Sequence, residues 1–373
     1  MLQKPDGPCQ GDAGEASVDT KRIAILTGGG DCPGLNAVIR AAVKTGRGYG
    51  WDVYGVRNGF EGLRRVDTLR LSRERIKGIL PVGGTILGST NKINPFAVKI
   101  GDQVEDQSEL VLDNFREEGF DALIAIGGDG TQRIAQRFFE LGLPVVGVPK
   151  TIDNDVGATD VTFGFDTAVE TATDAIDKLH PTAESHQRVL VVEMMGRTVG
   201  WIALHAGIAG GADVILIPEI PFDVDAVCAA VERRYNSDRN FAIVVVAEGA
   251  RPVDGQLVEV EAAPRTLMGS PLCNALCEAI AAKTGREVRG LVLGHLQRGG
   301  SPTTYDRVLG SRYGAAAVRL IRDGRFGEMV ALRGNQITSV KIAEAIARVR
   351  EVDVAGDTVQ TARDLGISFG DRT

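Results

Sequence analysis

Short apolar runs recur along this chain, and they limit its fold more than any other feature. Each run is rich in Val, Ile or other apolar residues, ends at a glycine or a polar turn, and is followed by a helical pattern. The runs are Ile23–Leu26, Ala122–Ile126, Val145–Val148, Val189–Val192, Val214–Ile217, Ile243–Ala247 and Leu291–Leu293. Continuous runs of this length suit strands buried on both faces. They predict an α/β fold with largely parallel sheets, helices on both faces and ligand loops at the carboxyl ends of the strands.

Two segments show the repeating unit of strand, glycine loop and helix. The helix after the first run is indicated by apolar residues at helical spacing, Leu35, Val38, Ile39, Ala42 and Val43, and we expect Gly46 to stop it. The run Ala122–Ile126 leads through glycines 127, 128 and 130 into a helix predicted from Thr131 to about Leu141, ending at Gly142.

Length and charge exclude several classes of protein. At 373 residues the chain exceeds the roughly 250–300 residues of a single core, so two domains are expected, and without a low-complexity linker or a fixed-period repeat they should be closely packed or intertwined. No apolar run is long enough for a membrane span.

Residues 1–20 are acidic and rich in small residues, and we expect them to be a disordered extension rather than a signal peptide. The net charge of −7 argues against a nucleic-acid partner.

The five cysteines form no C-x-x-C pair, so neither a disulfide framework nor a four-ligand zinc site is indicated. Cys273 and Cys277, one helical turn apart, could share a metal ion, but small buried apolar thiols are the commoner use of such residues. A reducing cytoplasm is the expected location.

The first glycine loop, Thr27–Gly34, lies between a strand and a helix, where backbone N–H groups can approach a phosphate. Leu35 and Asn36 stand where a Walker P-loop would carry Lys and Ser or Thr, so a Walker-type NTPase is disfavoured. A tight turn without a ligand is the alternative for this loop considered alone.

Carboxylates accompany the next two loops. Asp129 lies inside the second glycine loop, where it could hold a Mg²⁺ ion on donor phosphates or simply cap the following helix. Asp153 and Asp155 follow the strand Val145–Val148, and such a pair can divide into a general base and a partner for a metal or an arginine. A solvated acidic turn is the alternative.

Cationic residues cluster after the later strands, in the segments Ser185–Arg188, Met195–Arg197 and Gly294–Gly300 and at Arg289. Arginine and histidine together suit a phosphorylated sugar better than a neutral metabolite. Each cluster taken singly could face solvent, but the ordered combination is poorly explained in that way.

The ordered motifs G-G-D-G-T, T-I-D-N-D, S-H-Q-R, M-G-R and G-H-x-Q-R-G-G resemble the phosphofructokinase family, from about Ile23 to about Ala317. The family phosphorylates fructose 6-phosphate at its 1-hydroxyl, a step of glycolysis. The resemblance implies two similar Rossmann-like αβα domains with the active site in the cleft between them. One domain would bind the donor and would consist of residues 21–164 with about 298–345. The other would bind the sugar phosphate and would consist of about 165–297 with 346–373.

The resemblance also implies roles for individual residues. Asp153 would be the general base, Thr151 and Arg197 would steady the transferring group, and Lys150 would pair with donor or product phosphate. The donor, ATP with Mg²⁺ on Asp129, would contact Gly29, Lys92, Gly128, Asp129, Gly130 and Thr131. The sugar phosphate would contact Thr151, Ile152, Asp153, Arg188, Met195, Gly196, Arg197, Glu248, Arg289, His295 and Arg298. Arg188 and Arg289 would come from a neighbouring subunit, which implies a homo-oligomer, a dimer or tetramer.

Two positions bear on the phosphoryl donor. Pyrophosphate-using members of the family carry Asp at the position of Gly130, so glycine favours ATP, whereas Lys150 is typical of the pyrophosphate branch. This combination is similar to a mixed actinobacterial-type group that mostly uses ATP. Lys92 stands near the position where the family usually has an arginine. A lysine there keeps the positive charge but lacks the two-pronged guanidinium that can bind a phosphate through two hydrogen bonds.

Two other classes of protein are alternatives. NAD kinases and diacylglycerol-type lipid kinases share G-G-D-G-T but not the later motifs. A non-catalytic regulatory paralogue would be expected to lack Asp129 or Asp153, and both are present. Arg40 and Glu219 match effector-site positions of bacterial relatives, which leaves regulation open.

Overall fold

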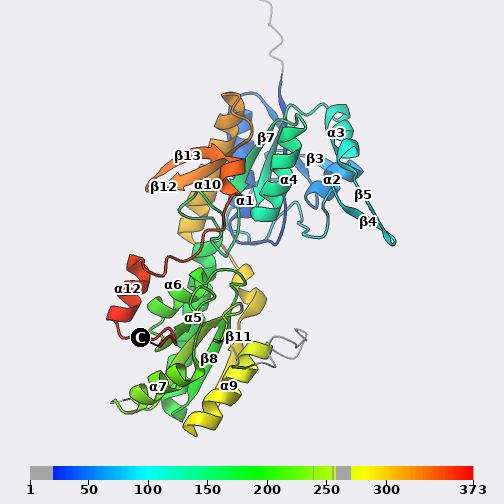
Figure 1. The fold of residues 1–373 in the computed structure, drawn as a ribbon. Helices are drawn as coiled ribbons and strands as arrows, with labels where there is room; N and C mark the ends of the chain where they lie inside the picture. Colours follow the sequence, from blue (N-terminus) through cyan, green and yellow to red (C-terminus); the bar gives the residue numbers. More distant parts are fainter. Residues whose placement is uncertain (1–19, 238, 254–255, 258–269, 373) are drawn as a thin grey trace, which may run out of the picture.

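The computed structural model describes residues 20–237, 239–253, 256–257 and 270–372 (Figure 1). The expected disordered extension, residues 1–20, lies outside these residues apart from Thr20. Two main sheets and a small hairpin make up the strands. The larger sheet contains β1 (Arg22–Thr27), β2 (Asp52–Val56), β3 (Thr68–Arg70), β6 (Ala122–Gly127), β7 (Val145–Pro149), β12 (Glu328–Arg333) and β13 (Gln336–Lys341). The smaller contains β8 (Val189–Met194), β9 (Val214–Leu216), β10 (Ala242–Ala247) and β11 (Val288–Val292).

The strand order brings the sequence-predicted loops together. The seven-stranded sheet runs β13-β12-β7-β6-β1-β2-β3, with only the outermost pairs, β12–β13 and β2–β3, antiparallel. The four-stranded sheet runs β11-β8-β10-β9 and is parallel throughout. Because β1, β6 and β7 are parallel neighbours, the loops that follow them emerge at one edge.

Helices cover both faces of the larger sheet. Ile23 and Ile25 of β1 face α1 (Leu35–Gly48) and α10 (Thr304–Arg322), whereas Ala24 and Leu26 face α2 (Phe60–Arg65), α3 (Ser108–Glu117) and α4 (Asp129–Glu140). This alternation follows the two-residue period of a strand. A Cβ on Gly314 would lie 2.3 Å from the Val38 carbonyl oxygen, so glycine lets α10 pack closely on α1.

The smaller sheet is covered in the same way, by α5 (Phe165–His186) and α6 (Trp201–Ala209) on one face and by α7 (Val224–Tyr235) and α9 (Pro271–Thr284) on the other. One continuous buried cluster joins α1 and α10 to α5 and α6. The remaining elements are the hairpin β4 (Val98–Ile100) and β5 (Gln103–Glu105), η1 (Gly294–Arg298), α11 (Ile342–Ala345) and α12 (Asp357–Asp364).

The α/β architecture with largely parallel sheets is confirmed, and each predicted run overlaps a strand. The boundaries differ in places. Helix α1 continues past Gly46 to Gly48, α4 begins at Asp129 rather than Thr131, and β11 begins at Val288 and ends at Val292. None of the helices in the described ranges is both long and apolar enough to cross a bilayer.

Candidate active site

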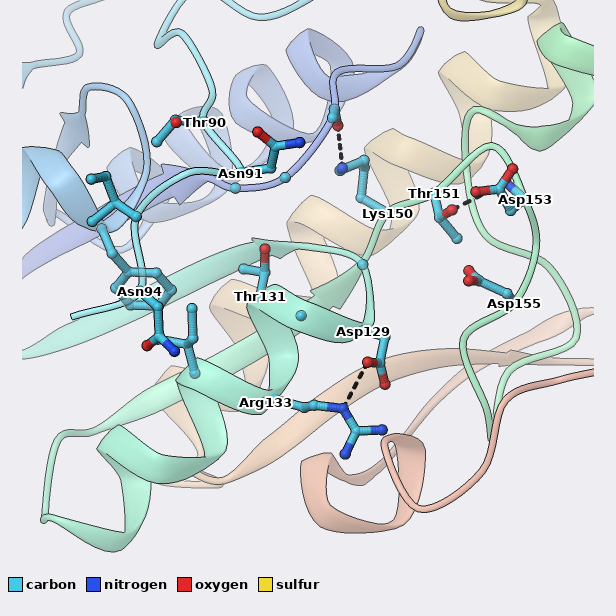
Figure 2. Close-up of a pocket in the computed structure, with 18 of the residues that line it drawn as sticks. Thr90, Asn91, Asn94, Asp129, Thr131, Arg133, Lys150, Thr151, Asp153 and Asp155 are labelled. Carbon is cyan, nitrogen blue, oxygen red and sulfur yellow. Dashed lines mark hydrogen bonds and ion pairs between the residues drawn. The ribbon is translucent and has the colours of Figure 1, made fainter. Parts of the chain in front are cut away.

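Three loops of the larger sheet line one cavity of about 680 Å³ (Figure 2). Glycines 28 to 30 follow β1, residues 128–131 follow β6, and Lys150–Asp155 follow β7. The remaining wall comes from other parts of the chain: Phe60, Thr90, Asn91, Ile93, Asn94, Arg133, Ile134, Arg137 and Arg298. The sequence predicted this juxtaposition for the strand-end loops.

Two glycines, Gly28 of the first loop and Gly127 at the end of β6, pack against one side chain, Thr131. An added Cβ would lie 2.6 Å from the Thr131 Oγ1 atom at Gly28 and 2.3 Å from it at Gly127. Gly130 differs, because an added Cβ there would meet no atom of the described part of the chain within 4 Å. A side chain at position 130 would therefore extend into open space at the cavity wall.

Gln132 supports the second loop from behind, although no sequence pattern singles it out. It is fully buried, and its Nε2 atom lies within hydrogen-bond distance of the carbonyls of Ala125 (3.2 Å), Gly127 (3.1 Å) and Val148 (3.1 Å). One amide group thus joins the carboxyl ends of β6 and β7.

Asp153 lies in the third loop, where its backbone N–H donates to the Thr151 hydroxyl at 3.1 Å (Figure 2). Burial, followed by the charge of Asp155, raises the pKa of Asp153 to about 6, with Arg298 and Lys150 acting in the opposite direction. A carboxylate with this pKa is mostly ionised at pH 7 and is still basic enough to accept a proton.

Lys150 bridges the first and third loops. Its side chain is buried, and the Nζ atom donates to the Gly30 carbonyl. Burial lowers the pKa of Lys150, although the nearby charge of Asp153 opposes that shift. The ammonium group therefore lies between the glycine loop and the acidic loop, at the edge of the cavity.

Asp129 is the first residue of α4 and does not cap it. The N-cap is Gly128, with no side-chain cap, and the Asp129 carboxylate instead accepts from Arg133 Nε at 2.7 Å. Arg133 also donates from Nη2 to the Ile346 carbonyl at 2.9 Å. The helix-cap alternative for Asp129 is therefore wrong.

Asp155 faces the same cavity as Asp129. Its Oδ1 atom is buried and has no hydrogen-bond partner among the residues that the structure describes, and burial raises the pKa of this carboxyl. Oxygen ligands of this kind suit Mg²⁺, which typically takes one or two carboxylates together with substrate phosphates. Within the described ranges no three His, Cys, Asp or Glu side chains cluster as a metal site, and the Cys273–Cys277 pair therefore has no third ligand there.

Residues from the smaller sheet approach the acidic loop. Met195 and Gly196 follow β8, and Glu248 follows β10; the Gly249 N–H donates to the Gly196 carbonyl at 3.0 Å. Arg298, at the end of η1, donates from Nη1 to the Asp31 carbonyl at 3.2 Å and so crosses to the first loop. Arg298 and Glu248 both act electrostatically on Asp153.

Several predicted residues lie outside the cavity. Arg197 lines a separate groove with Glu219 and Arg251, and Lys92 lines an adjoining cavity that shares Gly29 and Gly30 with the first. Ile152 is fully buried, and His295 is exposed on η1.

Two arginines share one acidic partner far from the cavity. Glu287 forms ion pairs with Arg188 at 2.8 Å and with Arg289 at 2.6 Å. Arg188 directly precedes β8, whereas Met195 directly follows it. A six-residue strand spans about 20 Å, so Arg188 lies at the end of the sheet opposite to the predicted sugar-phosphate loops.

The two effector-type positions are separated. Arg40 lies in a surface groove with Lys44, Arg73 and Lys77. Glu219 instead accepts the backbone N–H groups of Gly200 and Val352, each at 3.0 Å.

The sequence reasoning missed part of the cavity wall, namely Phe60, Ile93, Asn94, Arg133, Ile134 and Arg137. For α4 a signal was available, because Arg133 and Arg137 follow Asp129 at four-residue spacing and must share its face of the helix. Phe60 had no comparable signal, since it belongs to a short helix after an unpredicted strand.

The phosphofructokinase family model matches residues 22–321. The chain belongs to the phosphofructokinase family. It is 54% identical over 354 residues to an ATP-dependent 6-phosphofructokinase of Chloroflexus aurantiacus, covering 94% of this chain and 98% of that enzyme. It is 51% identical over 355 residues to a pyrophosphate–fructose 6-phosphate 1-phosphotransferase of Streptomyces coelicolor, covering 94% and 100%.

Solved structures of the family share the fold. Phosphofructokinase from Saccharomyces cerevisiae matches with a TM-score of 0.75 at 31% identity, over 94% of this chain and 48% of that chain, so this chain spans about half of the yeast subunit. A pyrophosphate-dependent phosphofructokinase from Nitrosospira multiformis matches with a TM-score of 0.78 at 21% identity, over 93% and 92%, which supports the fold alone.

Proposed function

We propose that the protein is an ATP-dependent 6-phosphofructokinase, which transfers the γ-phosphoryl group of ATP to the 1-hydroxyl of fructose 6-phosphate. The observation that carries the proposal is the position of Asp153, a half-buried carboxylate with a pKa of about 6, beside Lys150 and Arg298 in the cavity of the three strand-end loops. Phosphoryl transfer depends mainly on positioning and charge compensation, which this arrangement supplies.

In the proposed reaction the sugar 1-hydroxyl oxygen attacks the γ-phosphorus, and the bond from that phosphorus to the β-phosphate oxygen breaks. Asp153 accepts the hydroxyl proton, while Thr151 holds the backbone of the same loop. Lys150 offers its ammonium to the phosphate oxygens between the loops. Asp129 and Asp155 would hold a Mg²⁺ ion, which would neutralise donor phosphate charge.

The sugar phosphate would lie between the third loop and the smaller sheet, against Glu248, Met195, Gly196 and Arg298. Ile152, Arg197 and His295 belong to the same proposed set, with Arg197 reaching in from its neighbouring groove. In the domain division that accompanies this proposal, residues 21–164 with about 298–345 bind the donor, and about 165–297 with 346–373 bind the sugar phosphate.

The shape of the cavity favours ATP over pyrophosphate as the donor. Beyond the second loop the wall includes Phe60, Ile93 and Ile134, three apolar side chains that suit a nucleobase and would have no role for pyrophosphate. The open space at Gly130 leaves room for a nucleotide phosphate. Gly29, Gly128 and Thr131 would contact the donor phosphates, with Lys92 reaching from the adjoining cavity.

Pyrophosphate remains the second candidate donor, and the specific observation behind it is Lys150. Its ammonium is fixed between two loops, where it can neutralise a compact, highly charged donor. The relatives at about half identity include enzymes of both kinds.

The donor is tested by measuring fructose 1,6-bisphosphate formation with ATP and with pyrophosphate at matched concentrations, for the wild type and for Gly130→Asp. We expect a strong preference for ATP in the wild type. An aspartate beside donor phosphate should cost several kcal/mol, which is a loss of ATP turnover of about a hundredfold or more. A wild type that prefers pyrophosphate, or a variant that keeps full ATP turnover, would overturn the donor assignment.

We further propose a homo-oligomer, a dimer or tetramer, in which Arg188 and Arg289 complete the sugar-phosphate site of a neighbouring subunit. Both lie too far from their own subunit's acidic loop to serve it. Nearby β11 is an edge strand, and Leu291, Val292 and Leu296 are exposed to 41%, 42% and 69%. The proposal includes a cytoplasmic location, supported by four free cysteines in the described ranges.

Subunit mixing tests the shared site. Arg188→Ala and Asp153→Asn subunits should each be nearly inactive, whereas hybrids should regain turnover, because one site then combines a native Asp153 with a native Arg188. Hybrids as inactive as their parents would contradict the sharing.

A further inference from the structure

The chain returns from the larger to the smaller sheet through residues 346–353, between α11 and α12 (Figure 1). We call these residues the return segment. They lie outside the residues matched by the family model and outside the cavity wall. Their hydrogen bonds nevertheless reach each part of the proposed site.

The return segment first contacts the donor side. The carbonyl of Ile346 accepts from Arg133, the arginine that also pairs with Asp129. Three residues later, Val349 forms an antiparallel bridge with Val156, directly after the acidic loop.

Arg350 then makes contacts in two directions. Its backbone N–H donates to the Asp155 carbonyl at 2.9 Å, and its Nη1 atom donates to the Asn154 carbonyl at 3.4 Å. Its own carbonyl accepts the indole N–H of Trp201 at 2.8 Å, and its guanidinium lies over the Trp201 ring, 4.2 Å from the centroid. Arg350 thus joins the acidic loop to the first residue of α6.

The far end of the segment holds the same helix. The Val352 N–H donates to Glu219, whose carboxylate also accepts the Gly200 N–H at the start of α6. Gly200 closes the loop that begins with Met195, Gly196 and Arg197. The return segment is therefore bonded to the loop of the proposed base and to the helix that anchors the proposed sugar-phosphate loop.

The guanidinium of Arg350 is not placed as an ordinary surface charge. It is half-buried, and its nearest contacts among the described residues are the Trp201 ring and the Asn154 carbonyl. Burial lowers the pKa of Arg350, although the charge of Asp160 opposes that shift. Desolvating a charge in this way costs free energy, against which the ring face and the carbonyl contribute favourable contacts.

We propose that Arg350 is a positioning residue, which holds the Asn154–Asp155 backbone against Trp201 and so keeps Asp153 in register with the sugar-phosphate side of the site. The inference rests on the proposed function, since it assigns Arg350 to the alignment of base and acceptor. Asn154 has a φ of +56°, a conformation that a non-glycine residue needs its surroundings to maintain.

Steady-state kinetics provide the first test, with Arg350→Met, Arg350→Lys and, as a matched control, Arg348→Met, which removes an exposed arginine from the same segment. Misplacing reacting groups slightly can cost up to about 100-fold in rate, so Arg350→Met should lower kcat by about 10- to 100-fold. The KM for ATP should stay within about twofold, since Arg350 is absent from the donor cavity. Arg350→Lys should recover part of the loss, and Arg348→Met should match the wild type.

Trp201 supplies a readout that does not depend on turnover. The chain has two tryptophans, and Trp51 lies just before β2, at the end of the sheet remote from the site. Fructose 6-phosphate added to the wild type should change the Trp201 emission; the signal that disappears in Trp201→Phe is the part due to Trp201. In Arg350→Met this ligand-induced change should be lost, with bound sugar phosphate verified by equilibrium dialysis.

The outcomes separate the two proposals. A wild type that fails to phosphorylate fructose 6-phosphate contradicts the proposed function, and the variants are then compared on the acceptor that it does use. Wild-type kcat and Trp201 response in Arg350→Met would overturn the positioning role. So would equal losses in kcat and in ATP affinity together with a lower melting temperature, because these would indicate a general structural role.

Discussion

The Arg133 guanidinium holds the Asp129 carboxylate, with 2.7 Å between Nε and Oδ2, on the face of α4 that lines the donor cavity. The proposed metal ligand thus already has a cationic partner in the protein. A Mg²⁺ ion that binds Asp129 must compete with that partner.

Replacing Arg133 with Met should therefore lower the Mg²⁺ concentration needed for half-maximal activity. Partly exposed pairs of this kind contribute up to about 1 kcal/mol, so the shift should be about two- to fivefold. Mn²⁺ binding to the protein without substrate, followed by electron paramagnetic resonance, should tighten by a similar factor. Arg116→Met, which breaks an exposed pair with Asp113 on α3, serves as the control; equal Mn²⁺ affinity in both variants would contradict the competition.

Asp153→Asn should abolish the proposed base while preserving the size of the side chain. General-base catalysis contributes about 10²- to 10⁴-fold, so kcat should fall within that range. The KM for ATP should change little, because Asp153 is not among the proposed donor contacts. Full turnover in this variant, measured by product formation, would exclude Asp153 as the base.

The activity should depend on pH through the same carboxylate. Asp153 must be ionised to accept a proton, and its pKa is raised to about 6, so kcat/KM should fall as the pH drops through about 6. The charge of Arg298 opposes the rise in the pKa of Asp153. Replacing Arg298 with Met should therefore move the low-pH fall in kcat/KM, the acidic limb of the profile, to higher pH. A limb that stays in place in Arg298→Met would show that another group controls it.

Asp306 should make the stability depend on pH. This buried carboxylate accepts hydrogen bonds from Gly164 and Thr167 at the start of α5, and burial raises its pKa from 3.8 to about 6. The folded state then binds the proton more tightly than the unfolded state, so this contribution to the free energy of unfolding is greatest below about pH 4 and decreases as the pH rises through about 6.

Urea unfolding of the wild type and Asp306→Asn at pH 4.5 and at pH 7 checks this prediction. The variant lacks the titrating carboxyl group. Its free energy of unfolding should therefore fall further below that of the wild type at the lower pH than at the higher, by about 2–3 kcal/mol for a shift of about two pKa units. A deficit that is the same at both pH values would contradict the assignment.

The sequence predicted the central strands and the three strand-end loops because both depend on local pattern. Buried parallel strands are continuously apolar, as in Ala122–Gly127, and their carboxyl ends must meet at one edge. Strand β13 was missed because its partly exposed sequence alternates polar and apolar residues, and β2 because Gly55 interrupts it. Strand β12 was missed although its buried run Met329–Leu332 is continuously apolar. The pairing of Arg133 with Ile346 could not be predicted, since it joins positions brought together only by the tertiary fold.

The order of strands in the larger sheet has a consequence for biosynthesis. Strand β7 ends at Pro149, but its outer neighbour β12 begins only at Glu328, after the whole smaller sheet has been made. At about 5–20 residues per second, a ribosome needs on the order of ten seconds or more to deliver that neighbour. Throughout that interval the apolar strand Val145–Pro149 is an open edge of the nascent protein, available to other chains.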